Sequence, residues 1–312
     1  MTKCSICRRN EAFYVRVYSG EKLCRKCFLG SVENKVRGTI GKHRMFEMND
    51  RIAVAVSGGK DSVSLLHILS KIEADFPKAT LQAITVDEGI KGYRDEAVKT
   101  AAKNCSQLGI EHLIISFKEL FSYTLDEIVK RNHIEKLTPC AYCGVLRRRA
   151  LNIAARQVGA NKIATAHTLD DEIQTFFLNI IHGDPSRIAR SGPVFSSKRS
   201  GLVPRVKPFS EVMERESALY AYVKRVPFQE MPCPYAGEAL RNDVRNALNR
   251  LEERHPGMKY TIYGSMEKVQ QAMEETVQET ALKECEDCGE PTSANLCRIC
   301  QILRKLAETK NF

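Results

Sequence analysis

The chain has 312 residues, of which 43% are hydrophobic, enough for one large catalytic domain with small appendages. It has no apolar run of about eighteen residues and no apolar leader at its N-terminus, so we expect a cytoplasmic protein with no membrane partner. The net charge of +10 favours a polyanionic partner, and the absence of tryptophan argues against a broad platform for base stacking.

Four cysteines near the N-terminus have the spacing C-x2-C-x16-C-x2-C, which is typical of a four-thiolate zinc site. They are Cys4, Cys7, Cys24 and Cys27. A metal ion on such turns stabilises a segment that is too small for a core of its own. Disulfides are a poor alternative in a chain without an export signal. We therefore expect a zinc module over residues 1–30, followed by a basic connector over 31–50.

An apolar strand from Ile52 to Val56 leads into a glycine-rich turn at the start of a helix. The turn reads Ser57, Gly58, Gly59, Lys60, Asp61 and Ser62. Glycines let backbone N–H groups close on an anion, and the lysine and the helix N-terminus add positive charge. The spacing is not that of a Walker loop, and it resembles the signature of the PP-loop ATP pyrophosphatases, which cleave ATP to AMP and pyrophosphate. A simple glycine turn is the structural alternative.

Strand-like and helix-like segments alternate from Arg51 onward, and the later strands are expected at 81–86, 113–116 and 162–166. This order predicts an α/β catalytic domain with a parallel sheet over residues 51–210. Ligands of such sheets lie beyond the carboxyl ends of the strands. The polar turn after the first strand, Asp87 after the second and His167 after the last should therefore meet at one edge.

A third cysteine group combines Cys140 and Cys143 with the distant Cys233, which lies in a Pro-Cys-Pro-Tyr motif. Three thiolates suit a zinc ion with a free position or a 4Fe-4S cluster in which one iron has no protein ligand. A redox-active Cys-x-x-Cys pair and plain buried cysteines remain as alternatives. Cys105, in an apolar helical pattern, is expected to be a core thiol.

Acidic residues open the helix after the last strand, in the sequence Asp170-Asp171-Glu172. Acidic side chains at this place interact favourably with the helix dipole, which is the structural alternative to a functional role. Together with Asp61, however, they also suit a magnesium ion that binds phosphate oxygens. We predict that Asp61 or Asp171 holds this ion. His167 is either a core residue or a contact to adenosine.

The stretch from 185 to 210 has no acidic residue, and its six basic residues favour contact with RNA phosphates. They are Arg187, Arg190, Lys198, Arg199, Arg205 and Lys207. Arg147, one helical turn after Cys143, is expected to reach phosphate or a developing negative charge.

A helical extension that carries Cys233 is expected over residues 211–280, with breaks at Gly257 and Gly264. A second zinc module should follow over residues 281–312, with the spacing C-x2-C-x8-C-x2-C. Its ligands would be Cys285, Cys288, Cys297 and Cys300.

In combination and in order, these motifs resemble the tRNA 2-thiouridine synthetases of the archaeal and eukaryotic cytosolic type, over nearly the whole chain. The resemblance implies a 4Fe-4S cluster on the third cysteine group and catalytic roles for Asp61 and Asp171. It also implies an ATP site on the phosphate loop that includes Ala55, Asp87, Ala166 and His167. Ala166 and Thr168 depart from the glycine and asparagine usual in the family, a change at the expected adenosine contact.

The resemblance implies an ATP-dependent tRNA uridine 2-sulfurtransferase. Uridine O2 would attack the α-phosphate of ATP, and sulfide from the Fe-S site would displace AMP to give 2-thiouridine. The wobble uridine is favoured over a T-loop uridine, the sulfur donor is a ubiquitin-like carrier or free sulfide, and a homodimer is expected. Alternatives are another PP-loop tRNA-modifying enzyme of the 2-thiocytidine or lysidine type, and a non-catalytic zinc-ribbon RNA-binding protein.

Overall fold

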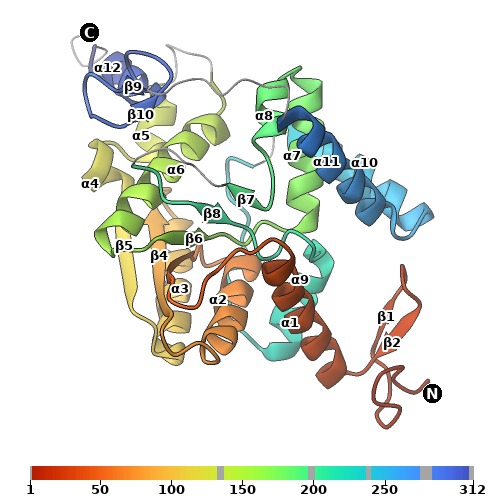
Figure 1. Ribbon diagram of the computed structural model, residues 1–312. Coiled ribbons are helices and arrows are strands. Elements are labelled where there is room, and N and C mark those ends of the chain that lie inside the picture. The colour runs from red at the N-terminus through yellow and green to blue at the C-terminus, as the bar shows by residue number, and fades with distance from the viewer. Residues whose placement is uncertain (1, 132–136, 196–200, 237–239, 275–282, 309–312) are drawn as a thin grey trace.

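The computed structural model describes residues 2–131, 137–195, 201–236, 240–274 and 283–308. In this part of the chain the central sheet has six strands in the order β5-β4-β3-β6-β8-β7, all parallel to their neighbours except β7 (Figure 1). The strands are β3 (Arg51–Ala55), β4 (Thr80–Asp87), β5 (His112–Ser116), β6 (Lys162–Ala164), β7 (Val194–Phe195) and β8 (Arg205–Val206). The predicted parallel α/β sheet is confirmed, and β7 and β8 are additions that the sequence did not indicate.

Both faces of the sheet are buried, which explains why its strands read as continuous apolar runs. In β3, Ile52 and Val54 belong to a core that includes α2 (Lys60–Glu73) and α9 (Glu214–Lys224). Ala53, on the opposite face, belongs to a second core with α6 (Pro139–Gln157). Side chains alternate along a strand, so each strand contributes to both layers.

A third core lies beside the sheet, where α10 and α11 pack on α7 (Figure 1). Helix α3 (Arg94–Leu108) adds to the first core, and α4 (Phe117–Phe121) and α5 (Leu125–Lys130) add to the second. The third core is formed by α7 (Leu169–Ile181), α8 (Pro185–Ala189), α10 (Leu240–Arg254) and α11 (Met258–Glu274). Gly257 separates α10 from α11 with a φ of +94°. The break predicted at Gly264 is wrong, because the buried neighbours Tyr263 and Met266 hold α11 together around this residue.

The two cysteine-rich modules lie at opposite ends of the molecule (Figure 1). The first contains β1 (Tyr14–Arg16) and β2 (Glu21–Leu23), and the second contains β9 (Lys283–Glu284), β10 (Pro291–Thr292) and α12 (Arg298–Glu308). Within each quartet the four sulfur atoms lie within 4.8 Å of one another, an arrangement that suits a single metal ion. Helix α1 (Arg25–Lys42) begins inside the first module and continues through most of the expected connector. None of the described helices is long and apolar enough to cross a membrane.

A buried ion pair fixes the first module to the catalytic layer. Arg16 in β1 donates from Nε to Glu216 Oε1 of α9 at 2.6 Å, and the Glu216 side chain is 0% exposed. Lys35 of α1 reaches the other carboxylate oxygen at 3.1 Å. Three elements therefore meet at one desolvated carboxylate. Burial of this charge costs free energy of folding unless both cationic partners are present.

We predict that Glu216→Gln lowers the free energy of unfolding by about 3 kcal/mol, because it leaves Arg16 and Lys35 without their buried anion. Urea denaturation measures the change. The matched control is Asp75→Asn, which removes the partner of the exposed Arg37 and should cost less than about 1 kcal/mol. Equal effects of the two substitutions would contradict this role for Glu216.

Candidate active site

The glycine-rich turn has the geometry of an anion-binding loop. Gly58 has a φ of +89°, and a Cβ there would lie 2.2 Å from the carbonyl oxygen of Ala97 in α3. Only glycine fits this close approach. The Ser62 hydroxyl accepts from Ser57 N at 3.0 Å and donates to Gly59 O at 2.9 Å, which closes the turn over the start of α2. The unpaired amides of this helix N-terminus are suited to phosphate.

Lys60 and Asp61 lie at the mouth of this loop. Lys60 Nζ is 2.9 Å from Asp61 Oδ2 and 2.9 Å from Glu214 Oε1. The second oxygen, Asp61 Oδ1, is buried and accepts no hydrogen bond of regular geometry from the described residues, although the Ser217 hydroxyl interacts with this carboxylate. Burial raises the pKa of Asp61, although Lys60 opposes this effect, and the charge of Asp171 also raises it. A cation at Oδ1 would satisfy this unpaired oxygen.

The adjacent carboxylates Asp170 and Asp171 have different surroundings. Asp170 is buried, accepts from Glu214 N at 2.7 Å and pairs with Lys259, so it anchors α9 and α11. Asp171 caps α7, where its Oδ2 accepts from Thr168 N at 2.9 Å. The capping alternative therefore describes its hydrogen bonds correctly. Asp171 is nevertheless close enough to Asp61 for its charge to raise the pKa of that carboxyl.

The remaining residues expected at the nucleotide follow the ends of the strands. Asp87 Oδ1 accepts from Gly89 N at 2.8 Å and turns the chain after β4, while Ala55 ends β3. His167 is exposed, so the core alternative for this residue is wrong, and Thr165 Oγ1 lies 2.8 Å from its Nδ1. Desolvation by the surrounding protein, followed by the charge of Lys207, lowers the pKa of His167 to about 4. Ala166, the residue before it, is half-buried.

The third cysteine group is assembled from two elements. Cys140 is exposed and Cys143 is buried, both in the first turns of α6, while Cys233 is half-buried in the loop after α9. Cys140 Sγ lies 3.6 Å from Tyr235 O, and Cys233 is near enough to both other thiols to interact with them electrostatically. Among the described residues these thiols are not gathered within 4.8 Å as the terminal quartets are. A multi-iron cluster, whose cysteine ligands bind different irons, fits this wider spacing better than a single ion does.

Arg147 connects the cysteines to a buried carboxylate. Its Nη2 donates to Cys143 Sγ at 3.0 Å, and its Nε lies 2.7 Å from Glu88 Oε1. Burial raises the pKa of Cys143 to about 11 although Arg147 opposes it, whereas a redox-active thiol requires a lowered pKa. Arg147 is thus held by Cys143 and Glu88, and its contact with a phosphate or a developing negative charge stays a prediction.

The same carboxylate reaches the phosphate loop. Glu88 Oε2 pairs with Arg94 Nε at 2.6 Å, and Arg94 Nη1 donates to Ser57 O at 2.9 Å. Both Glu88 and Arg94 are almost fully buried. Contacts therefore run without interruption from Cys143 to the loop. Sequence reasoning placed Glu88 at this edge after the strand end but gave it no role, and it missed Arg94, the first residue of α3.

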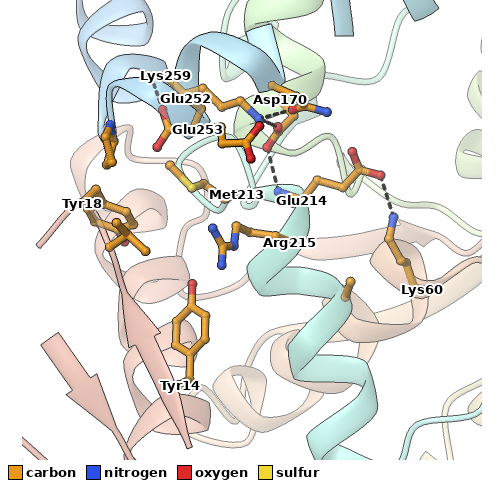
Figure 2. A pocket seen from close by; sticks show the side chains of 14 residues that line it. Tyr14, Tyr18, Lys60, Asp170, Met213, Glu214, Arg215, Glu252, Glu253 and Lys259 are labelled. Carbon is orange, nitrogen blue, oxygen red and sulfur yellow. Dashed lines mark hydrogen bonds and ion pairs between the residues drawn. The ribbon is translucent and has the colours of Figure 1, made fainter. Parts of the chain in front are cut away.

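A pocket of about 630 Å³ opens beside the loop, between the first cysteine module and helices α9, α10 and α11 (Figure 2). Lys60 and Glu214, joined by their ion pair, line one side of it, and Asp170 and Lys259 line another. Glu252 and Glu253 add further carboxylates, so this pocket is less suited to a bare phosphate than the loop itself.

The basic stretch after α7 divides into different environments. Arg187 and Arg190 are exposed, whereas Lys207 pairs with the buried Glu172 at 2.7 Å and is a structural cation. Lys198 and Arg199 lie outside the described residues. Arg205 is described below with its neighbours.

Comparison with known proteins agrees with this site. A family model described as a PP-loop domain matches residues 31–252. The "Probable sulfurtransferase" of Methanocaldococcus jannaschii is 38% identical over 96% of this chain and 87% of its own length. The "tRNA 2-thiolation protein NcsA" of Haloferax volcanii is 35% identical over 97% of this chain and 99% of its own.

A solved structure extends the similarity to three dimensions. It is described as the U34-tRNA thiolase NcsA from Methanococcus maripaludis with its [4Fe-4S] cluster, and it is 32% identical to this chain. The TM-score is 0.85, over 98% of this chain and 97% of the other. The match thus includes the terminal modules as well as the sheet. By sequence and by structure, this chain belongs to the PP-loop family and, within it, to the tRNA 2-thiolation proteins.

Proposed function

We propose that this enzyme converts a tRNA uridine to 2-thiouridine at the expense of ATP. The observation that carries the proposal is the path of contacts from Cys143 through Arg147, Glu88 and Arg94 to the carbonyl of Ser57. It connects a three-thiol site to a phosphate loop, which a sulfur transfer driven by ATP requires. The relatives described as tRNA 2-thiolation proteins support the same reaction.

Activation of the base would take place at the phosphate loop. The amides around Gly58 and Gly59 bind the phosphates, and Lys60 exchanges a carboxylate partner for a phosphate oxygen. Asp61 and Asp171 would hold Mg²⁺, which would offset negative charge as pyrophosphate leaves. Uridine O2 then forms a bond to the α-phosphorus, and the base carries AMP as a leaving group. The neutral His167 contacts the nucleotide without repelling a cation.

Sulfur transfer would follow at the cysteines. Cys140, Cys143 and Cys233 fit a 4Fe-4S cluster, which supplies an open coordination position from which sulfide is delivered. Arg147 fixes the Cys143 sulfur, and Glu88 fixes Arg147. Attack at C2 breaks the C2–O2 bond, so AMP departs with the former uridine oxygen. The protein's task is to hold the activated carbon and the sulfur donor at a reacting distance.

Further assignments follow from the same comparison. The wobble uridine is the proposed target, because the similar structure is described as a U34-tRNA thiolase. Each terminal quartet holds one zinc ion, and the sulfur comes from a ubiquitin-like carrier or from free sulfide. The active form is a homodimer in the cytoplasm. The net charge of +10 provides a general attraction for tRNA.

Nucleoside mass spectrometry tests the proposed reaction. Unmodified tRNA is incubated with anaerobically reconstituted protein, magnesium-ATP and sulfide, and cluster-free protein is the control. The proposal requires 2-thiouridine only when both ATP and cluster are present. Formation of 2-thiocytidine, or no thiolated base with a verified cluster and either sulfur source, would refute it.

A Gly58→Ala substitution should weaken ATP binding by at least about tenfold, since the added Cβ would push the loop away from Ala97 and misalign its amides. Equilibrium binding of ATP measures the effect. Gly92→Ala is a suitable control, because Gly92 also has a positive φ but no atom lies within 4 Å of an added Cβ. Similar ATP affinities for the two variants would argue against a phosphate-binding role for the loop.

Substitution of single cysteines distinguishes a cluster ligand from a cysteine with a purely structural role. Cys233→Ala should abolish thiolation and lower bound iron while the zinc content stays unchanged, because Cys233 lies outside both quartets. Cys105→Ala, which removes a buried thiol from the core, should retain iron and thiolation. Full thiolation by Cys233→Ala would remove this residue from the reaction.

A further inference from the structure

Two arginines beside the cysteine site have no carboxylate partner. Arg148 follows Arg147 in α6, and Arg205 lies in β8. Within the described residues neither forms an ion pair, whereas Arg147, Arg149 and Arg156 of the same helix all pair with glutamates. An arginine pair left without an anion in a densely paired region is a candidate for binding one from outside.

The backbone brings these two side chains to one place. The side-chain amide of Asn152 makes two hydrogen bonds to the segment before β8. Its Nδ2 donates to Gly201 O at 2.9 Å, and its Oδ1 accepts from Val203 N at 2.8 Å. Arg148 lies one helical turn before Asn152 and so shares this face of α6. Val206 is buried in the core on the far side of the sheet, so Arg205 points toward the α6 side.

The arrangement leaves positive charge in a poorly hydrated but accessible place. The Arg205 guanidinium lies 5.4 Å from the centre of the Phe195 ring, which fixes its position. Loss of hydration, together with repulsion from Arg148, lowers the pKa of Arg205 to about 10. Loss of hydration and the nearby Arg187 also lower the pKa of Arg148, whose side chain remains exposed. A bound anion would relieve both effects.

We propose that Arg148 and Arg205 bind a backbone phosphodiester of the tRNA strand that carries the target uridine. The inference rests on the proposed function and adds the binding site that places the base. The phosphates of ATP bind to the amides of the Gly58 loop, so they do not occupy Arg148 and Arg205. Arg147 is held by Glu88 and is not part of this pair. Arg148 lies five residues after Cys143 in α6 and is close enough to this thiol to interact with it electrostatically, so a phosphate here would bring its nucleotide near the cysteines.

Binding of tRNA and ATP to Arg148→Ala and Arg205→Ala variants tests the site. Each variant should raise the Kd for tRNA about tenfold and reduce the salt dependence of binding by about one charge, with the Kd for ATP unchanged. Arg148→Lys and Arg205→Lys should recover most of the affinity. Arg37→Ala removes the same charge from an arginine that pairs with Asp75 and is the matched control.

The possible outcomes distinguish failure of this tRNA-binding site from failure of the proposed reaction. A tRNA affinity in both alanine variants equal to that of Arg37→Ala overturns the proposal, as does a loss of ATP affinity in place of tRNA affinity. Wild-type protein that binds tRNA but forms no 2-thiouridine refutes the proposed function alone. If Arg205→Ala fails to fold, as thermal unfolding would show, Arg148→Ala and the lysine variants decide the question.

Discussion

The active site depends on one buried carboxylate. Glu88 leaves the end of β4 with a 3% exposed side chain and pairs with Arg94 of α3 and Arg147 of α6. A desolvated carboxylate is tolerated only when its partners are in place, so its burial fixes both helices relative to the strand end. Arg94 then holds the carbonyl of Ser57, and Arg147 holds the sulfur of Cys143. Glu88 therefore helps to fix the glycine-rich loop relative to the cysteines of α6.

The parallel sheet supplies the frame around that contact. The ends of β3, β4 and β6 are neighbours, so the glycine-rich loop, Glu88 and His167 reach one edge although they lie far apart in sequence. Asp170 ties the start of α9 to α7, and Glu216 ties the first cysteine module to α9. A perturbation of the first module or of α7 can thus reach the loop through α9, which also carries Glu214, the partner of Lys60.

Sequence alone predicted the parts of the site that have short-range signatures. The loop, the Cys-x-x-Cys pair and both quartets could be read from spacing, because backbone turns and soft ligands impose it. Glu88, Arg94 and Glu214 could not, since their importance comes from pairing between distant elements. Strands β7 and β8 have two residues each, which is too short to show the alternation of apolar and polar residues that marks a strand. The pairing of Arg147 with Glu88 could not be predicted for the same reason, because Glu88 lies on another element.

The central claim is that uridine O2 attacks the α-phosphorus of ATP and leaves with AMP. Its most direct test uses tRNA whose target uridine carries ¹⁸O at O2, incubated with reconstituted protein, magnesium-ATP and sulfide, followed by mass spectrometry of the AMP. The account predicts one ¹⁸O atom in AMP for each 2-thiouridine formed. Unlabelled AMP together with thiolated tRNA would show that ATP is cleaved without activating the base, and would contradict the mechanism.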